Sequence, residues 1–239
     1  MPPSSPTAPM HDDDSLLALL WMASPTLPIG GFSYSEGLEA AIDAGLVHDE
    51  TSAADWLCDQ LWLTQARSDL VVLGQALAAW RASDWERLQA LDQWVRLTRE
   101  SAELRLQSEQ MGRSLMEWAK SLRLPDCPTA RLPPGLASPT YPVAFAYGLW
   151  LRLPPTAPVR AGVLCAAFAW AENMVQAAIK ALPLGQGAGQ RVLARVCLSI
   201  PQAVTEALQT SDAQRQSFSP MWAILSARHE TQYSRLFRS

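Results

Sequence analysis

The chain has 239 residues, of which 49% are hydrophobic and 18% are charged, a composition typical of a globular protein that can bury its own core. The formal net charge is −4 and lysine and arginine are dispersed, which argues against a nucleic-acid-binding protein with a basic face. The four cysteines are far apart and contain no C-x-x-C pair. Neither a disulfide framework nor a zinc site is therefore expected, and the chain fits a reducing cytoplasm.

The amino terminus is expected to be a disordered leader spanning residues 1–13. It is rich in proline, serine and aspartate, and it lacks the cationic start and apolar core of a secretion signal. The acidic run after His11 is interpreted as a solvated stretch rather than a metal site. No apolar run approaches the length of a membrane span, so no association with a membrane is expected.

From residue 14 onward, apolar side chains recur at helical spacing without sustained alternation of period two, which predicts an all-α fold. A first helix, around residues 16–21, should stop before the next prolines, and a second, at about 35–44, should end with Gly45 as a left-handed cap. Ser52 and Ser83 each precede an acidic residue by three positions. Both serines are predicted to cap new helices. The helix from Ser52 has Leu63 among its core positions, and a turn is expected between it and a second long helix that contains Leu70 to Trp80.

The second half of the chain predicts more helices around one proline-rich excursion. Residues 85–122 have helical spacing with a break near Ser101, and residues 123–142 contain most of the loop-forming prolines. Helices are then expected at residues 143–151, 158–181, 186–200 and 220–233, where the helix opened by Pro158 is apolar enough to be central. These elements amount to about ten helices in a single domain, residues 14–239.

Two glycine-rich segments resemble nucleotide-binding loops only superficially. The run from Gly30 to Gly37 is followed by Leu38 and Glu39, without the lysine and serine or threonine that a phosphate loop needs. The run from Gly185 follows a predicted helix rather than the strand of a dinucleotide fingerprint. Each segment is therefore either a tight turn between packed helices or a contact surface for a partner.

The sequence contains no recognisable catalytic centre. There are only three histidines, no serine lies in a G-x-S-x-G elbow, and His229-Glu230 lacks the second histidine of a zinc protease motif. The carboxyl-terminal run from Tyr233 to Ser239 alternates cations with apolar side chains. This tail either packs on its own domain or becomes ordered when it binds a partner, since arginine and aromatic residues are strong interface residues.

Several blocks of the sequence, in the same order along nearly the whole chain, resemble the UreF family of urease accessory proteins. The first block contains ASPTLPIGGFSYSEGLEAAIDAG, and Ala146 departs from the glycine expected after Val-Ala-Phe. The blocks are Leu19 to Gly45; Glu103, Arg105, Ser108, Met111 and Gly112; Tyr141 to Phe145; Pro183 to Gln186 with Gly189 and Gln190; and His229-Glu230 with Arg235 to Phe237.

This resemblance implies an all-α, dimer-forming, non-enzymatic protein without a cofactor. Such a protein would join the accessory protein UreD, also called UreH, and the GTPase UreG to deliver nickel into apo-urease. The alternative is a metallochaperone that carries nickel itself, but such a carrier would need clustered ligands, and the dispersed histidines and cysteines favour the scaffold. The expected partner-binding residues are Ser33, Tyr34, Glu39, Gly185, Gln186, Gln190, His229, Glu230, Arg235, Phe237 and Arg238.

Overall fold

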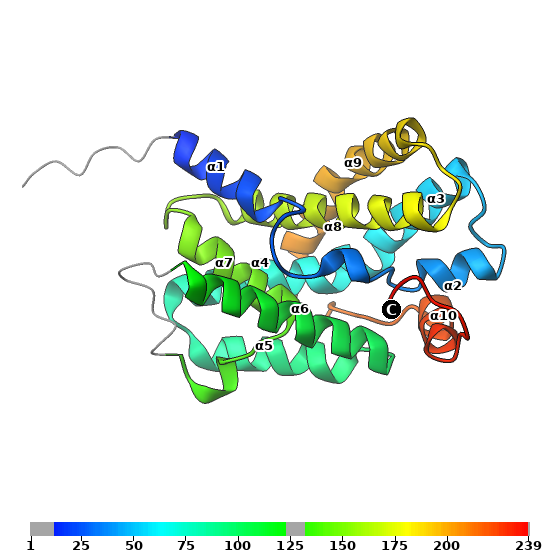
Figure 1. The fold of residues 1–239 in the computed structure, drawn as a ribbon. Coiled ribbons are helices and arrows are strands. Elements are labelled where there is room, and N and C mark those ends of the chain that lie inside the picture. The colour runs from blue at the N-terminus through cyan, green and yellow to red at the C-terminus, as the bar shows by residue number, and fades with distance from the viewer. Residues whose placement is uncertain (1–11, 123–131, 239) are drawn as a thin grey trace, which may run out of the picture.

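A computed structural model of the chain describes residues 12–122 and 132–238. Within these ranges the chain forms one domain of ten α-helices without a strand, which confirms the predicted all-α fold (Figure 1). The helices are α1 (Asp12–Met22), α2 (Leu38–Asp43), α3 (Glu50–Gln60), α4 (Leu70–Ala82), α5 (Trp85–Thr98), α6 (Ala102–Ser121), α7 (Tyr141–Arg152), α8 (Val159–Ala181), α9 (Gln186–Gln209) and α10 (Pro220–Glu230). Short 3-10 segments occur at Gly31–Ser33 and Pro134–Leu136, and a π-helix occurs at Leu61–Asp69.

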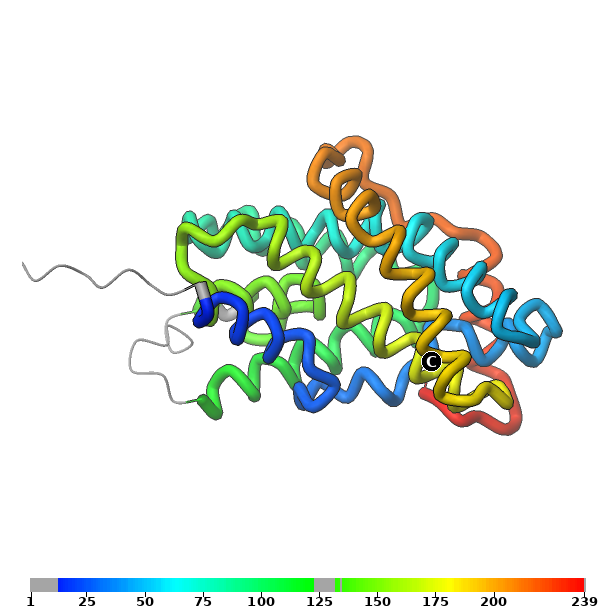
Figure 2. Tube along the Cα trace, turned by 90° about the horizontal axis from the view of Figure 1, so that it is seen from above, coloured from blue at the N-terminus to red at the C-terminus, as the bar shows by residue number. Residues whose placement is uncertain are grey.

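Helix α8 lies in the middle of the fold, as its alanine-rich apolar sequence predicts. It packs against α9 on one side and against α4 on the other, while α4, α6 and α7 pack together beneath it (Figure 1). From above, α9 turns back from the end of α8 and runs over both α8 and α3 (Figure 2). Contrary to the sequence expectation that no apolar run is long enough, α8 has the length and composition to cross a membrane, a property that core helices of globular proteins share.

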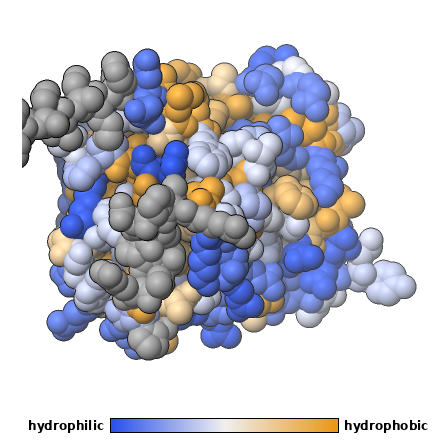
Figure 3. Space-filling view, turned by 60° about the vertical axis from the view of Figure 1, so that its left-hand side comes forward, coloured by the Kyte–Doolittle hydropathy of each residue, from blue (hydrophilic) through white to orange (hydrophobic). Residues whose placement is uncertain are grey.

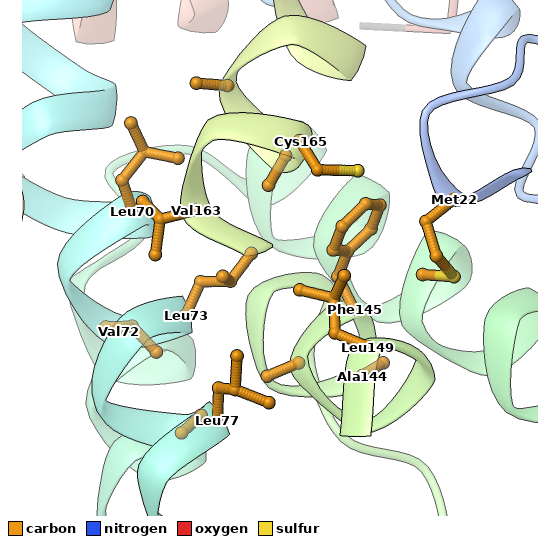
Figure 4. Close-up of a cluster of buried hydrophobic side chains, with 14 of the residues drawn as sticks. Met22, Leu70, Val72, Leu73, Leu77, Ala144, Phe145, Leu149, Val163 and Cys165 are labelled. Carbon is orange, nitrogen blue, oxygen red and sulfur yellow. The ribbon is translucent and has the colours of Figure 1, made fainter. Parts of the chain in front are cut away.

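The main core lies where α4, α7 and α8 meet, and α1 closes it at one side. Trp80 of α4 is fully buried, and its indole nitrogen donates a hydrogen bond to the carbonyl oxygen of Val143 at 3.0 Å. That bond satisfies the one polar group of the largest core side chain. Figure 4 shows side chains from the four helices converging, among them Met22, Leu73, Leu77, Phe145, Leu149, Val163 and Cys165.

Helix α1 packs on the bundle through one face only. Ala18 and Met22 are buried, whereas Leu16, Leu17 and Leu20 are more than half exposed. Hydrophobic side chains also lie in small groups between hydrophilic ones on the face shown in Figure 3.

Helix α1 begins at Asp12, two residues before the predicted boundary of the leader, and residues 1–11 lie outside the described ranges. The same is true of residues 123–131 in the proline-rich excursion.

Two of the predicted helix caps were placed on the wrong residue. Helix α3 is capped by Asp49, whose carboxylate accepts from the Ser52 backbone N–H at 2.8 Å. In return, the Ser52 hydroxyl oxygen accepts from the Asp49 backbone N–H at 3.0 Å. Helix α5 is capped by Asp84 rather than Ser83, which instead ends α4 in the left-handed region at φ 53°. In both cases an aspartate near the predicted serine supplies the stronger, charged acceptor. Gly45 and Ser101 take the predicted roles.

The predicted turn between the third and fourth helices does not exist. Residues 50–82 run continuously from α3 through the π-helix into α4, because no glycine or proline interrupts residues 50–73. The π-helix rotates the polar side chains Thr64, Gln65 and Ser68 into the interior and leaves Leu63, a predicted core residue, 39% exposed. A π-helix of this kind is often found at functional sites.

Three other helix boundaries also differ from prediction. Helix α9 continues through Pro201 to Gln209, and Arg160 Nη2 donates to the Pro201 carbonyl oxygen at 2.9 Å from outside the helix. Helix α2 begins at Leu38 rather than near residue 35, because Gly37 takes a positive φ of 79° just before it. Helix α10 ends at Glu230, three residues before the predicted end.

Glycines let neighbouring segments approach closely at two of these contacts. A Cβ added to Gly112 of α6 would lie 2.1 Å from the carbonyl oxygen of Pro139, which is backbone and cannot turn away. A Cβ on Gly189 of α9 would lie 2.2 Å from Ile179 Cδ1 of α8. Gly189, the last glycine of the run at the start of α9, therefore serves close packing between two helices, which agrees with one of the two interpretations of that run.

We predict that Gly112→Ala destabilises the fold while Gly187→Ala does not. The added methyl group at position 112 should lower the free energy of unfolding by about 3 kcal/mol through overpacking. Position 187 has only the end of the Arg191 side chain nearby, so alanine there should leave stability unchanged or raise it by up to about 1 kcal/mol. Chemical denaturation of both variants measures this, and equal stabilities would contradict it.

Candidate functional site

The two sequence segments around residues 30–39 and 229–238 meet at one end of the molecule, beside α2 and α10 (Figure 1). A second hydrophobic cluster joins them: Leu38 and Ala41 of α2, Ala178 of α8 with Leu182 directly after that helix, and Phe237 of the tail pack together. Because Leu182 and Leu184 lead directly into the glycine run of α9, this third segment borders the same cluster. The fold thus brings the three glycine-rich or polar segments to one region.

His229 lies at the centre of this region and is completely buried. Its Nδ1 is 2.8 Å from Glu103 Oε2 of α6, and its Nε2 is 3.1 Å from Glu39 Oε2 of α2. A carboxylate can only accept hydrogen bonds, so an imidazole with a carboxylate at each nitrogen satisfies both contacts only when both nitrogens donate. We call these three residues the Glu39–His229–Glu103 cluster. It joins α2, α6 and α10 through charge-assisted hydrogen bonds.

Glu39 also holds the tail by its backbone. Its Oε1 accepts from the Leu236 N–H at 2.7 Å, and its Oε2 accepts from the Phe237 N–H at 3.0 Å. The Arg238 N–H then donates to the Ser33 carbonyl oxygen at 2.7 Å. The carboxylate stands in the first turn of α2, where the helix dipole favours a negative charge. One buried carboxylate therefore satisfies a histidine ring and two backbone donors of the tail.

Glu103 is the second anchor of the tail. Its Oε1 accepts from Arg235 Nη1 at 2.8 Å, and its backbone N–H donates to Glu230 Oε1 at 3.1 Å. Glu230 thereby caps the first turn of α6, where backbone N–H groups have no partner within the helix. Arg235 and Glu230 are exposed, so solvent screening limits what each ion pair contributes to stability.

Phe237 and Tyr34 complete the docking of the tail. The Phe237 ring is 5% exposed, and Lys180 Nζ of α8 lies 4.7 Å from its centroid, which is a cation–π contact. The Tyr34 hydroxyl donates to Gln110 Oε1 at 2.6 Å. Burial raises the pKa of Tyr34, and the nearby Arg238 partly offsets that increase.

The expectation that the tail becomes ordered only on binding is therefore not what the structure shows, because the tail packs on its own domain. The expected partner-binding residues fall into two groups. Four are buried in the docking contacts and reach no surface: Tyr34, Glu39, His229 and Phe237. The others are exposed or half-exposed: Ser33, Gly185, Gln186, Gln190, Glu230, Arg235 and Arg238. Direct contact with a partner stays a prediction for this second group.

Sequence reasoning missed Glu36, which lies beneath the same loop. Its backbone has a positive φ of 52°, which is uncommon for a residue with a side chain. Its carboxylate accepts from Gln107 Nε2 at 2.8 Å and from Trp170 Nε1 at 2.9 Å, and its carbonyl oxygen accepts from Trp222 Nε1 at 2.6 Å. Glu36 therefore links the loop to α6, α8 and α10. Its position between Ser35 and Gly37 in a turn was the only local signal.

Burial raises the pKa of the Glu36 carboxyl, and the negative charge of Asp69 raises it further. Asp69, the last residue of the π-helix, is paired with Arg99, whose Nη2 lies 2.7 Å from Asp69 Oδ1 and 2.9 Å from Oδ2. This ion pair is mostly buried. Two acidic groups and one arginine thus lie inside the domain, under the loop that carries the glycines.

Among the described residues, no group of three or more histidine, cysteine, aspartate or glutamate side chains is arranged to hold a metal ion. In the Glu39–His229–Glu103 cluster the two carboxylates lie at opposite nitrogens of the ring rather than around a common point. The amino-terminal His11 lies outside the described residues.

Comparison with known proteins identifies the family. The UreF family model matches residues 47–197, which is more than half of the chain. The chain belongs to the UreF family of urease accessory proteins. Urease accessory protein UreF of Paracidovorax citrulli (strain AAC00-1) is 60% identical over 94% of this chain and 89% of its own length. That of Methylibium petroleiphilum is 55% identical over 99% of this chain and 98% of its own length.

A further relative is a bifunctional urease accessory protein, UreEF, from Bordetella bronchiseptica. It is 44% identical over 97% of this chain, which covers 53% of that longer protein. The resemblance noted from the sequence motifs is thus confirmed at the level of the family. Membership gives the chain a role in urease maturation.

We predict that Phe237→Ala destabilises the domain and that Tyr233→Ala, four residues earlier in the same tail, does not. Removing a buried aromatic ring should lower the free energy of unfolding by about 3 kcal/mol. Tyr233 is fully exposed, so its truncation should change stability by less than about 0.5 kcal/mol. Chemical denaturation of the two variants decides it. Identical unfolding midpoints would mean that the tail is not docked in solution.

We also predict a pH-dependent effect of Glu36→Gln. The pKa of Glu36 is higher in the folded than in the unfolded state, so the folded chain holds this proton to a higher pH. As pH rises from the unfolded-state pKa through the folded-state pKa, the Glu36 carboxyl therefore progressively lowers the free energy of unfolding. The stability of the glutamine variant relative to the parent should therefore increase from pH 4 to pH 8. Denaturation midpoints across this range measure it, with exposed Glu86→Gln as the control. A constant difference would contradict the prediction.

Proposed function

We propose that this chain is a non-enzymatic scaffold of urease maturation that binds UreD/UreH and recruits and regulates the GTPase UreG, so that nickel is delivered into apo-urease in the cytoplasm. The observation that supports this most is the docked tail. Its contacts arrange exposed charged and amide side chains from three distant segments at one end of a rigid helical domain. Proteins that act through their surfaces need such fixed side chains more than they need a reactive centre.

The exposed residues at this end offer two adjacent groups of contacts. Arg235, Arg238 and Glu230 stand on the tail and on the end of α10, and their charges favour an oppositely charged partner surface. Gln186 and Gln190 lie four residues apart on the first turns of α9 and share one helix face. We assign the glutamine group and the loop at Ser33 to UreG, and the tail group to the complex with UreD and UreG.

The buried residues support this role indirectly. Glu39 and His229 reach no partner themselves, but they hold Arg235 and Arg238 in place through the backbone of the tail. Their replacement would thus affect stability and partner binding together, whereas replacement of Gln190 or Arg238 would affect partner binding alone. This difference separates positioning residues from contact residues.

Two further observations support a role within an assembly. A sequence like this one makes up about half of the bifunctional accessory protein UreEF of Bordetella bronchiseptica, which fits a chain that works beside other accessory proteins. The exposed leucines of α1 fit self-association, and the homodimer stays a prediction that light scattering can measure.

We predict that Arg238→Ala and Gln190→Ala each reduce co-purification with a partner at least tenfold while leaving the melting temperature within about 2 °C of the parent, because both side chains are exposed. Arg238→Ala should weaken assembly of the complex with UreD and UreG, and Gln190→Ala should weaken recruitment of UreG. Arg113→Ala, an exposed arginine on the middle of α6, is the matched control.

The experiment is a pull-down of each variant against UreD and UreG, separately and together. Full complex formation by both variants would contradict the proposed surface. Nickel binding by the isolated chain, measured by equilibrium dialysis, would favour the metallochaperone instead. Nucleotide hydrolysis by the isolated chain would contradict a non-enzymatic role.

A further inference from the structure

A cleft with a volume of about 100 Å³ lies between α8 and the segment that follows α1. One side of it is a single face of α8, because the four residues that line it are spaced i, i+3, i+4 and i+7 along the helix. They are Ala169, Glu172, Asn173 and Gln176. The other side is formed by residues 23–32, which pass beside α8 (Figure 1). The cleft has several times the volume that a single water needs, which is about 10 to 15 Å³.

The two sides of the cleft are held together by the protein itself. Asn173 Nδ2 of α8 donates to the Gly31 carbonyl oxygen at 3.0 Å. Pro25 and Pro28 restrict the backbone of the segment between α1 and Gly31. The cleft is therefore preformed, so a group that enters it does not have to order the loop at the expense of affinity.

The base of the cleft is apolar and its mouth is exposed. Met22, Leu27 and Met111 line it and are each at most 5% exposed, whereas Phe32 is 70% exposed. Phe32 is therefore placed at the opening, directly before Ser33 of the candidate surface. A side chain that enters here meets methionine and leucine side chains, which accept an aliphatic stem.

The polar groups of the cleft are mainly hydrogen-bond acceptors. The Glu36 carboxylate accepts from Trp170 Nε1 at 2.9 Å, and Glu172 Oε1 accepts from Gln176 Nε2 at 3.1 Å. These bonds use N–H groups of the wall, while each carboxylate, with about four acceptor positions, can accept more. Among the described residues that line the cleft there is no lysine, arginine or histidine. The lining thus carries two carboxylates without a cation.

We propose that this cleft receives a lysine or arginine side chain of UreG, with its aliphatic stem along the apolar base and its cationic end bound to Glu36 and Glu172. The inference rests on the proposed function, in which the loop at Ser33 faces UreG. An ammonium group has three donors and a guanidinium has five, so either can bind both carboxylates through charge-assisted hydrogen bonds.

Other kinds of partner side chain fit the cleft less well. A neutral apolar side chain would displace water from the two carboxylates without replacing the hydrogen bonds, which costs free energy. An acidic side chain would be repelled by both. The net charge of −4 on the whole chain also favours the approach of a basic partner segment. A basic side chain alone matches both the apolar base and the acceptors of the wall.

The first test is photo-crosslinking in the complex of the full chain with UreD and UreG, with p-benzoylphenylalanine in place of Phe32. Because Phe32 is mostly exposed, this replacement should leave the fold intact. Mass spectrometry locates the attached residue. The expected product is a crosslink to UreG at a position beside a lysine or arginine.

The control carries the same photo-reactive residue at Leu97, which is 75% exposed on α5, and it should not mark that UreG segment. A crosslink from position 32 to a UreG segment without a basic residue beside the attachment overturns the proposal. So does a crosslink to UreD or to a second copy of this chain, and so does the lack of any crosslink in a complex that contains UreG.

The second test removes a charge and keeps the volume. Glu172→Gln should weaken the binding of UreG to the complex of this chain with UreD at least about tenfold, whereas the exposed control Glu86→Gln should change it by less than about twofold. Glu172 is half-exposed on α8, so its replacement should leave the melting temperature close to that of the parent. Added salt should weaken the parent more than Glu172→Gln, because it screens the ion pair. Unchanged affinity or an equal salt dependence overturns the proposal.

These outcomes separate the role of the cleft from the proposed function. If the parent chain recruits no UreG, the proposed function fails and the inference fails with it. If the parent and Glu172→Gln recruit UreG equally well, the proposed function stands and only the role of the cleft is overturned.

Discussion

The candidate surface depends on the hydrogen bonds that the buried carboxylate of Glu39 accepts. A buried carboxylate without donors would cost far more free energy than a domain of this size can spare, and here three donors from one end of the chain surround it. The partner of His229 on its other side is a second carboxylate, so the ring is held from both sides. Removing any one member leaves the others buried and incompletely bonded, which makes the cluster cooperative.

The helical core gives this cluster a rigid frame. Helix α8 packs against α9 and α4, and its carboxyl-terminal end and the residue that caps it supply Ala178 and Leu182 to the cluster around Phe237. Helix α6 supplies Glu103 at its first turn and Gly112 at its close approach to Pro139. The tail is thus positioned by helices whose own places are fixed by the main core, so the exposed arginines extend from a defined backbone.

Hydrophobic periodicity was enough to predict the fold class, the central helix and most helix positions, because apolar spacing directly reflects which face is buried. It failed where one local signal overrode another. Asp49 and Asp84 replaced the predicted serine caps, and the run through residues 61–69 stayed helical because no breaker interrupts it. The resemblance to a family marked Glu39 and His229 as part of a pattern. That they form one buried cluster depends on packing between segments about 190 residues apart, which no local pattern contains.

The position of the tail also bears on how the protein is made. A chain emerging from the ribosome folds from its amino terminus, so α2 and its Glu39 are synthesised long before the backbone donors at positions 236 and 237 that complete them. The region around α2 therefore stays incomplete until residues 236 and 237 have left the ribosome. Until then the chain can form its helical core and yet lack the docked tail, with the Glu39 carboxylate short of two of its three donors.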